Sequence, residues 1–148
     1  MLKSPVCVDA NIVVMIVAPE ALRPQAIALW NSWLEQDREI VAPRLLAYEV
    51  TSALWRKVVR GLFTAEEGQR ALRTALEMGV TFTDPPALSQ RAFELAARFR
   101  RPAAYDAHYL ALADHLECPF WTADERLYNG VHADFPRVRW LGDYRAGG

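Results

Sequence analysis

The sequence predicts a single α/β domain in which a short, mostly parallel central sheet is flanked by helices on both faces. Two observations carry this prediction. Short apolar runs alternate along the chain with longer segments of helical periodicity, and some of these runs end at an acidic residue just before a helix signal. The chain of 148 residues fits one domain, and no linker, repeat or low-complexity segment divides it.

The first half of the chain contains two of the predicted strands. The expected elements are a strand over 5–8, a helix starting near 11, a helix over about 20–36, a strand over 39–42 and a helix over about 44–60. Asp9 ends the first strand, and Pro43 is well placed to start the helix after the second strand. Gly61 is a natural stop for that helix.

The second half continues the alternation. The expected elements are a helix from 64 to 79, a strand over 80–83, a helix over about 88–99, a helix over 105–116, a strand over 119–122, a short helix or turn to 130 and a strand over 137–141. Thr64 and Glu67 have the spacing of a capping box, and Pro102 ends the segment before the helix over 105–116. Tyr105, Tyr109 and Leu112 draw one apolar stripe along that helix.

Composition narrows the class of protein. With a net charge of −1, 52% hydrophobic residues and 24% charged residues, the chain shows no broad electrostatic footprint for long nucleic acid. Cys7 and Cys118 lie in or beside predicted central strands and are expected to be reduced and buried. The apolar run over 12–18 is shorter than the about 20 residues that span a bilayer, so we expect a cytoplasmic protein without a membrane segment.

Four acidic residues are the candidate catalytic residues. Asp9 and Asp124 each follow a predicted buried strand, Asp106 lies in the first turn of the helix that enters the second of these strands, and Glu49 lies at the edge of an apolar helix stripe. In a parallel sheet all four can converge on the crevice at the carboxyl ends of the strands. Several ionised carboxylates repel one another, so such a cluster needs a cation or bound protons.

Oxygen ligands of this kind suit hard divalent cations, and we expect Mg²⁺ or Mn²⁺. The expected metal ligands are Asp9, Asp106 and Asp124, with Glu49 either binding a second ion or orienting a water. Asn11 and Thr122 are expected to set the geometry through hydrogen bonds. One or two such ions can activate water for hydrolysis of a phosphodiester.

Each acid also has a purely structural interpretation. Asp9 or Asp124 alone is more often a helix N-cap than a ligand. Asp106 alone can complement the helix dipole, and Glu49 alone is most often a solvated helix residue. Only their joint occurrence at matching places favours a metal site.

The segments VDANIVV, LLAYEVTSAL, YDAHYLALA and FWTAD, which contain Asp9, Glu49, Asp106 and Asp124, resemble the four acidic motifs of PIN-domain nucleases. The motifs occur in order over nearly the whole chain, and the combination most resembles the compact single-domain toxins of the VapC type. This resemblance implies one PIN-like domain over 1–148. It also implies a Mg²⁺- or Mn²⁺-dependent endoribonuclease with an RNA substrate, usually a homodimer, inhibited by a cognate antitoxin bound near the active site. In many relatives a further acid or polar residue follows the last motif, a place that Glu125 occupies here.

Other side chains are candidates for binding. Arg98, Arg100 and Arg101 precede the Asp106 motif and can contact RNA phosphates, although a charge run beside a proline is more often solvated. The tryptophans Trp30, Trp33 and Trp55 are expected in the core more than at an interface.

Two further functions remain open from the residues alone. A small-substrate phosphatase or phospho-aspartate protein also places acids at strand ends, but such sites usually need a lysine, and neither Lys3 nor Lys57 ends a predicted strand. The other is a catalytically silent PIN-fold interaction module. The presence of all four acids argues against this second function.

Overall fold

The computed structural model describes residues 4–147, so Lys3 lies outside the described part of the chain. Its centre is a five-stranded sheet whose paired strands are all parallel. The strands are β1 (Val6–Val8), β2 (Ile40–Ala42), β3 (Thr81–Phe82), β4 (Phe120–Thr122) and β5 (Val138–Trp140), and their order in the sheet is β3-β2-β1-β4-β5. The prediction of a mostly parallel sheet is confirmed.

The strand order reverses beside β1. From β1 the chain steps to β2 and β3 on one side, and it then crosses back to add β4 and β5 on the other side. Cys7 therefore pairs with Val41 of β2 and with Phe120 of β4. In open α/β sheets, ligands bind outside the carboxyl ends of the strands at such a reversal. Asp9 directly follows β1 at this point.

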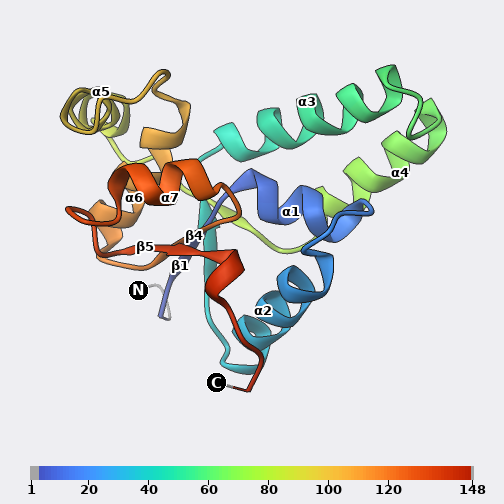
Figure 1. The fold of residues 1–148 in the computed structure, drawn as a ribbon, viewed down its shortest axis with the longest axis horizontal. Helices are drawn as coiled ribbons and strands as arrows, with labels where there is room; N and C mark the ends of the chain where they lie inside the picture. Colours follow the sequence, from blue (N-terminus) through green and yellow to red (C-terminus); the bar gives the residue numbers. More distant parts are fainter. Residues whose placement is uncertain (1–3, 148) are drawn as a thin grey trace.

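Helices cover both faces of the sheet, as the right-handed crossovers between parallel strands require. The helices are α1 (Ala10–Val17), α2 (Arg23–Glu35), α3 (Leu45–Val59), α4 (Ala65–Leu76), α5 (Leu88–Arg98), α6 (Tyr105–Leu116) and α7 (Glu125–Val131), and a 3₁₀ turn over Leu141–Asp143 follows β5. In Figure 1, α1 to α4 lie to the right of the strands and α5 to α7 to the left, and the hairpin of α3 and α4 extends away from the sheet.

Buried apolar side chains hold these layers together. The strands β1 and β2 are fully buried, and Tyr109 of α6 stacks on Phe120 of β4 with ring centroids 5.5 Å apart. Cys7 and Cys118 are buried free thiols, as predicted. None of the helices in residues 4–147 has the length and apolarity needed to cross a lipid bilayer.

Most element boundaries agree with the sequence prediction to within a few residues. The capping box of Thr64 and Glu67 is present, with both of its hydrogen bonds. The largest shift is at α2, which begins at Arg23 instead of near residue 20, because Pro24 occupies its first turn. Trp33 is buried, as expected for a core residue.

Trp55 corrects the prediction for the tryptophans. Its side chain is 60% exposed. Helix α3 continues past the sheet into the α3–α4 hairpin, where α4 packs beside it. Helical periodicity shows which residues share a face but not how far the helix extends beyond the core.

Candidate active site

A cavity of about 290 Å³ opens beyond the carboxyl ends of β1 and β4. All four predicted acids line it, together with residues from α1 and α3 and with Tyr109 of α6. The lining residues are Asp9, Ala10, Asn11, Val14, Met15, Glu20, Glu49, Ala53, Arg56, Asp106, Tyr109 and Asp124. The structure therefore brings together four acids, although the first and the last of them, Asp9 and Asp124, lie more than a hundred positions apart in the sequence.

Asp9 is fixed by hydrogen bonds that cross from β1 to β4. Its Oδ2 accepts from Thr122 Oγ1 at 2.8 Å and from Asn11 Nδ2 at 3.3 Å. The Asn11 side chain in turn accepts through Oδ1 from the backbone N–H of Ala123 at 3.0 Å, and Thr122 Oγ1 accepts from the backbone N–H of Asp124 at 3.0 Å. Asn11 and Thr122, which were predicted to support the site through hydrogen bonds, thus link Asp9 to the loop that carries Asp124.

The Asp9 carboxylate lies in an unfavourable environment for a negative charge. Asp9 is only 8% exposed to solvent. The pKa of Asp9 is raised to about 7, chiefly by burial and also by the nearby acids Glu49 and Asp124, while the hydrogen bond from Thr122 opposes the shift. Asp9 makes no side-chain cap to α1, so the N-cap interpretation fails here. A buried acid that does not cap a helix is consistent with a functional role.

Glu49 is held by a tyrosine from the opposite layer. The Tyr109 hydroxyl donates to Glu49 Oε1 at 2.5 Å, and Tyr109 itself is buried. Burial raises the pKa of the Glu49 carboxyl, the Tyr109 hydrogen bond lowers it, and Asp106 raises it. In the sequence, Tyr109 is predicted only as a member of an apolar helix stripe. The signal for its second role was present, because a buried tyrosine hydroxyl normally needs a hydrogen-bond partner.

Asp106 is held by Arg101 at one oxygen only. Both Arg101 Nε, at 3.1 Å, and Nη2, at 3.0 Å, contact Asp106 Oδ2. The other oxygen, Oδ1, is buried and has no hydrogen-bond partner among residues 4–147. Burial raises the pKa of Asp106, and the Arg101 charge lowers it. An unpartnered buried carboxylate oxygen is costly unless a ligand satisfies it.

Asp124 combines two roles. Its Oδ1 accepts from the backbone N–H of Leu127 at 3.1 Å, so it is the N-cap of α7, as its structural interpretation predicted. It also lines the cavity, where it contributes negative charge next to Asp9. Glu125 is the first residue of α7 and is exposed, and it does not line the cavity.

The donor set fits a hard divalent cation. The cavity presents carboxylate oxygens, and Asp106 Oδ1 lacks a partner there. Within residues 4–147, however, no three His, Cys, Asp or Glu side chains are already arranged as a metal-binding group. Each acid is instead engaged by a protein group: Glu49 by Tyr109, Asp106 by Arg101 and Asp124 by the start of α7. The set of metal ligands therefore stays a prediction.

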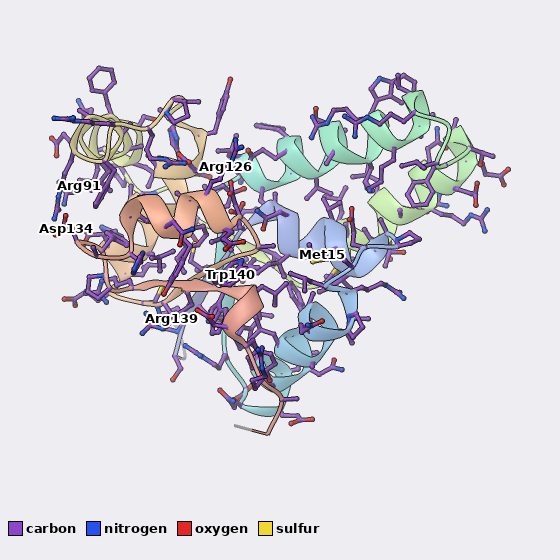
Figure 2. All side chains as sticks on the ribbon, viewed as in Figure 1. Met15, Arg91, Arg126, Asp134, Arg139 and Trp140 are labelled. Carbon is purple, nitrogen blue, oxygen red and sulfur yellow. The ribbon has the colours of Figure 1, made fainter. Side chains whose placement is uncertain are left out.

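The candidate RNA-binding arginines lie in different surroundings. Arg101 is occupied by Asp106, and Arg100 is exposed. Arg98 lies over the Phe99 ring and lines a separate cavity together with Arg91, Asp134 and Arg139. In Figure 2, Arg91, Asp134 and Arg139 lie toward the left of the molecule, and Met15, which lines the acidic cavity, lies to their right. RNA contact by these arginines stays a prediction.

Lys57 bears on the phosphatase alternative. It pairs with Glu20 through Nζ and Oε1 at 2.6 Å. It is not among the residues that line the acidic cavity. The cations that do lie beside the acids are the guanidinium groups of Arg56 and Arg101. Among residues 4–147, therefore, no lysine lines this cavity, although phosphate-transfer sites usually need one.

Comparisons with known proteins identify the family of this chain. Residues 6–131 match the PIN domain family model, a range that runs from β1 to the end of α7 and includes all four acids. Ribonuclease VapC9 of Mycobacterium tuberculosis is 36% identical over 107 residues, which are 68% of this chain and 82% of that protein. Ribonuclease VapC3 of Pyrobaculum aerophilum is 30% identical over 122 residues, which are 81% of this chain and 89% of that protein.

Solved structures share the fold at lower identity. A chain in the structure of VapBC2 from Rickettsia felis bound to a promoter DNA fragment superposes with a TM-score of 0.64, at 12% identity over 92% of this chain and 96% of that chain. A chain of FitAcB from Neisseria gonorrhoeae also gives a TM-score of 0.64, at 15% identity over 94% and 99%. With its acids at the carboxyl ends of a parallel sheet and its relatives among the ribonucleases, the chain belongs to the PIN-domain family and, within it, to the VapC type.

Proposed function

We propose that this protein is an endoribonuclease, the toxin of a type II toxin–antitoxin pair, and that it hydrolyses RNA phosphodiester bonds with Mg²⁺ or Mn²⁺. The observation that carries the proposal is the convergence of Asp9, Glu49, Asp106 and Asp124 on one cavity, in which Asp106 Oδ1 has no hydrogen-bond partner among the described residues. The relatives that match over most of their length are named ribonucleases.

The cation would be held by Asp9, Asp106 and Asp124, and Glu49 would bind a second ion or act on the water. A bound divalent cation supplies positive charge for the phosphodiester oxygens and makes water more acidic. Asp9 is kept in place by Thr122 and Asn11. Arg101 holds Asp106 Oδ2 and so leaves Oδ1 for the ion.

Glu49 is suited to handle the proton of the attacking water. Its carboxylate faces the cavity, and Tyr109 fixes Oε1. Burial raises its pKa toward the working range, which favours proton acceptance by a general base. Water would attack phosphorus and pass one proton to Glu49, while the bond from phosphorus to the departing ribose oxygen breaks and that oxygen takes up a proton from solvent water.

The first test is cleavage of total tRNA and rRNA by the purified, antitoxin-free protein. We expect discrete cuts with Mg²⁺ or Mn²⁺, none with EDTA, and none from an Asp9→Asn variant in any condition. Binding of Mn²⁺ measured by calorimetry gives a second readout, which should weaken in the same variant. Full activity and unchanged metal affinity in Asp9→Asn would refute the proposal and favour a silent interaction module.

A cognate antitoxin is the proposed protein partner, and the active unit is proposed to be a homodimer. The α3–α4 hairpin supports a protein partner there, because Trp55, Val59 and Leu62 are 60%, 68% and 66% exposed. An apolar cavity of about 130 Å³, lined in part by Trp55, lies between the two helices. Exposed tryptophan beside an apolar pocket is typical of interface hot spots.

We expect Trp55→Ala to weaken the complex with the antitoxin by at least about tenfold, because truncation of a hot-spot residue commonly costs 2 kcal/mol or more. The measurement is the dissociation constant of the purified pair, with RNA cleavage by the free variant as the control. Cleavage should be unchanged, because Trp55 does not line the acidic cavity. An unchanged dissociation constant would move the antitoxin to another surface.

A further inference from the structure

A second cavity adjoins the acidic one and has a different chemistry. It measures about 410 Å³, within the roughly 300–1,000 Å³ of small-ligand sites. Its lining residues are Leu45, Tyr48, Glu49, Ser52, Arg56 and Tyr105. Glu49 and Arg56 also line the acidic cavity, so these two side chains border both spaces.

Two exposed tyrosines border this second cavity from different helices. Tyr48 lies on α3 and is 69% exposed, and Tyr105 is the first residue of α6 and is 63% exposed. Neither ring is needed to fill the core at these exposures. Two accessible aromatic rings at one cavity are uncommon on a surface without a ligand, because large apolar groups gain by leaving water.

Arg56 supplies positive charge between the two cavities. Its Nη1 donates to Ser52 Oγ at 3.0 Å, one turn earlier on α3, which orients the side chain. A guanidinium has five N–H donors, and the Ser52 contact uses one of them. Arg56 forms no ion pair with any acid within residues 4–147 by direct contact. It can therefore offer a planar set of donors to a phosphate.

We infer that this second cavity binds an unpaired nucleotide next to the scissile phosphodiester, with its base stacked on Tyr48 or Tyr105 and its phosphate against Arg56. This inference rests on the proposed ribonuclease function. Because Glu49 and Arg56 border both cavities, a strand whose phosphodiester lies among the acids brings its neighbouring nucleotide beside the second cavity at high effective concentration. Base stacking on aromatic rings requires an unpaired base, so the substrate class is single-stranded or looped RNA.

The composition of the cavity favours a nucleotide over a protein segment. Tyrosine rings, a guanidinium and a hydroxyl match a base, a phosphate and a ribose. The α3–α4 hairpin patch is the opposite case, with Trp55, Val59 and Leu62 exposed beside an apolar pocket. The two surfaces thus lie on the same helix α3 but have different chemistry, which allows a matched comparison.

The test compares Tyr48→Ala and Tyr105→Ala with Tyr48→Phe, Tyr105→Phe and Trp55→Ala. Binding of a labelled single-stranded oligoribonucleotide is measured by fluorescence anisotropy in the Asp9→Asn background, so that the RNA stays intact. We expect each alanine variant that removes a stacking ring to raise the dissociation constant about 5- to 100-fold, as stacking of about 1–3 kcal/mol per base implies. The phenylalanine variants keep the ring and should bind normally, and so should Trp55→Ala.

An abasic nucleotide identifies the contact directly. Placed next to the cleavage site, it should weaken binding to the protein with both tyrosines and cause little further loss in the double alanine variant. The same variants with Asp9 intact should cut single-stranded RNA with a lower kcat/KM by a similar factor.

Three results would overturn the inference. If both alanine variants bind and cut RNA normally, the tyrosines do not contact RNA, while the ribonuclease function stands. If they bind RNA normally but lose the antitoxin, the second cavity is a protein interface. If the protein with Asp9 intact neither binds nor cuts any RNA with Mg²⁺ or Mn²⁺, the proposed function itself fails and the nucleotide site fails with it.

Discussion

Replacing Asp9 with asparagine is expected to abolish metal-dependent RNA cleavage and to raise the melting temperature of the metal-free protein. The loss of activity should exceed about 100-fold, because even residues that only support a metal ligand cost 10- to 100-fold. The gain in stability follows from the removal of a buried charge near Glu49 and Asp124. A residue that stabilises the fold would give the opposite result.

The contribution of Asp9 to the free energy of unfolding depends on pH. The pKa of Asp9 is raised from 3.8 to about 7 in the folded protein, so between these values the folded state binds more protons than the unfolded state. The free energy of unfolding therefore falls as the pH rises from about 4 to about 7, and the loss is complete above pH 7. A shift of this size corresponds to a penalty on the order of 4 kcal/mol.

The measurement is thermal unfolding of both proteins without metal at about pH 4 and pH 8. We expect the melting temperatures to agree at the acidic pH and that of Asp9→Asn to be higher by roughly 10 °C at the alkaline pH. Asp134→Asn is the matched control, because Asp134 is exposed and lies outside the acidic cavity. Saturating Mg²⁺ should stabilise the protein with Asp9 and have little effect on the variant. A stability gap that is equal at both pH values would contradict the buried-charge account.

The sequence was sufficient to predict the strands and their acids because local signals define them. Apolar runs give the strands, and an acid at the end of a run gives a position where helix and sheet meet. The strands around Asp9 and Asp124 were both predicted, and so was a parallel sheet. What joins them is the pairing of β1 with β4, which lie more than a hundred residues apart. No local pattern encodes that pairing, and the convergence of the acids was predicted from the general geometry of parallel sheets and from the motif resemblance.

The side chains that control the acids were harder to predict, because their partners are distant or ambiguous. Tyr109 contacts Glu49 across 60 residues, and although a buried tyrosine hydroxyl needs a hydrogen-bond partner, the sequence does not show which residue provides it. Arg101 is only five residues from Asp106, yet an arginine run beside a proline is equally compatible with a solvated surface. Trp55 looked like a core residue because periodicity does not show where a helix leaves the core.

Arg101→Met is expected to destabilise the metal-free protein by roughly 2–3 kcal/mol, because it removes hydrogen bonds to a charged and largely buried carboxylate. The side chains of Arg101 and Asp106 are only 13% and 23% exposed, so solvent screens this pair weakly. Asp106 would then lack partners at both oxygens, because Oδ1 has none already. Mg²⁺ should narrow the stability gap by supplying positive charge, whereas cleavage should stay about 10- to 100-fold reduced because Asp106 loses its orientation.

A substitution at Gly130 on α7 tests the contact between Arg101 and Asp106 independently. A Cβ at this position would lie 2.7 Å from Arg101 Nη1, so Gly130→Ala must displace the guanidinium. We expect Gly130→Ala to reduce both stability and cleavage in the protein with Arg101. It should have little further effect in Arg101→Met, whose side chain leaves the space of Nη1 empty. Thermal unfolding of the two single variants and the double variant forms a double-mutant cycle. If the stability losses of the two single variants add in the double variant, Gly130 acts only through α7. If instead the coupling free energy is close to the full effect of Gly130→Ala, the glycine is required for Arg101 to lie against Asp106.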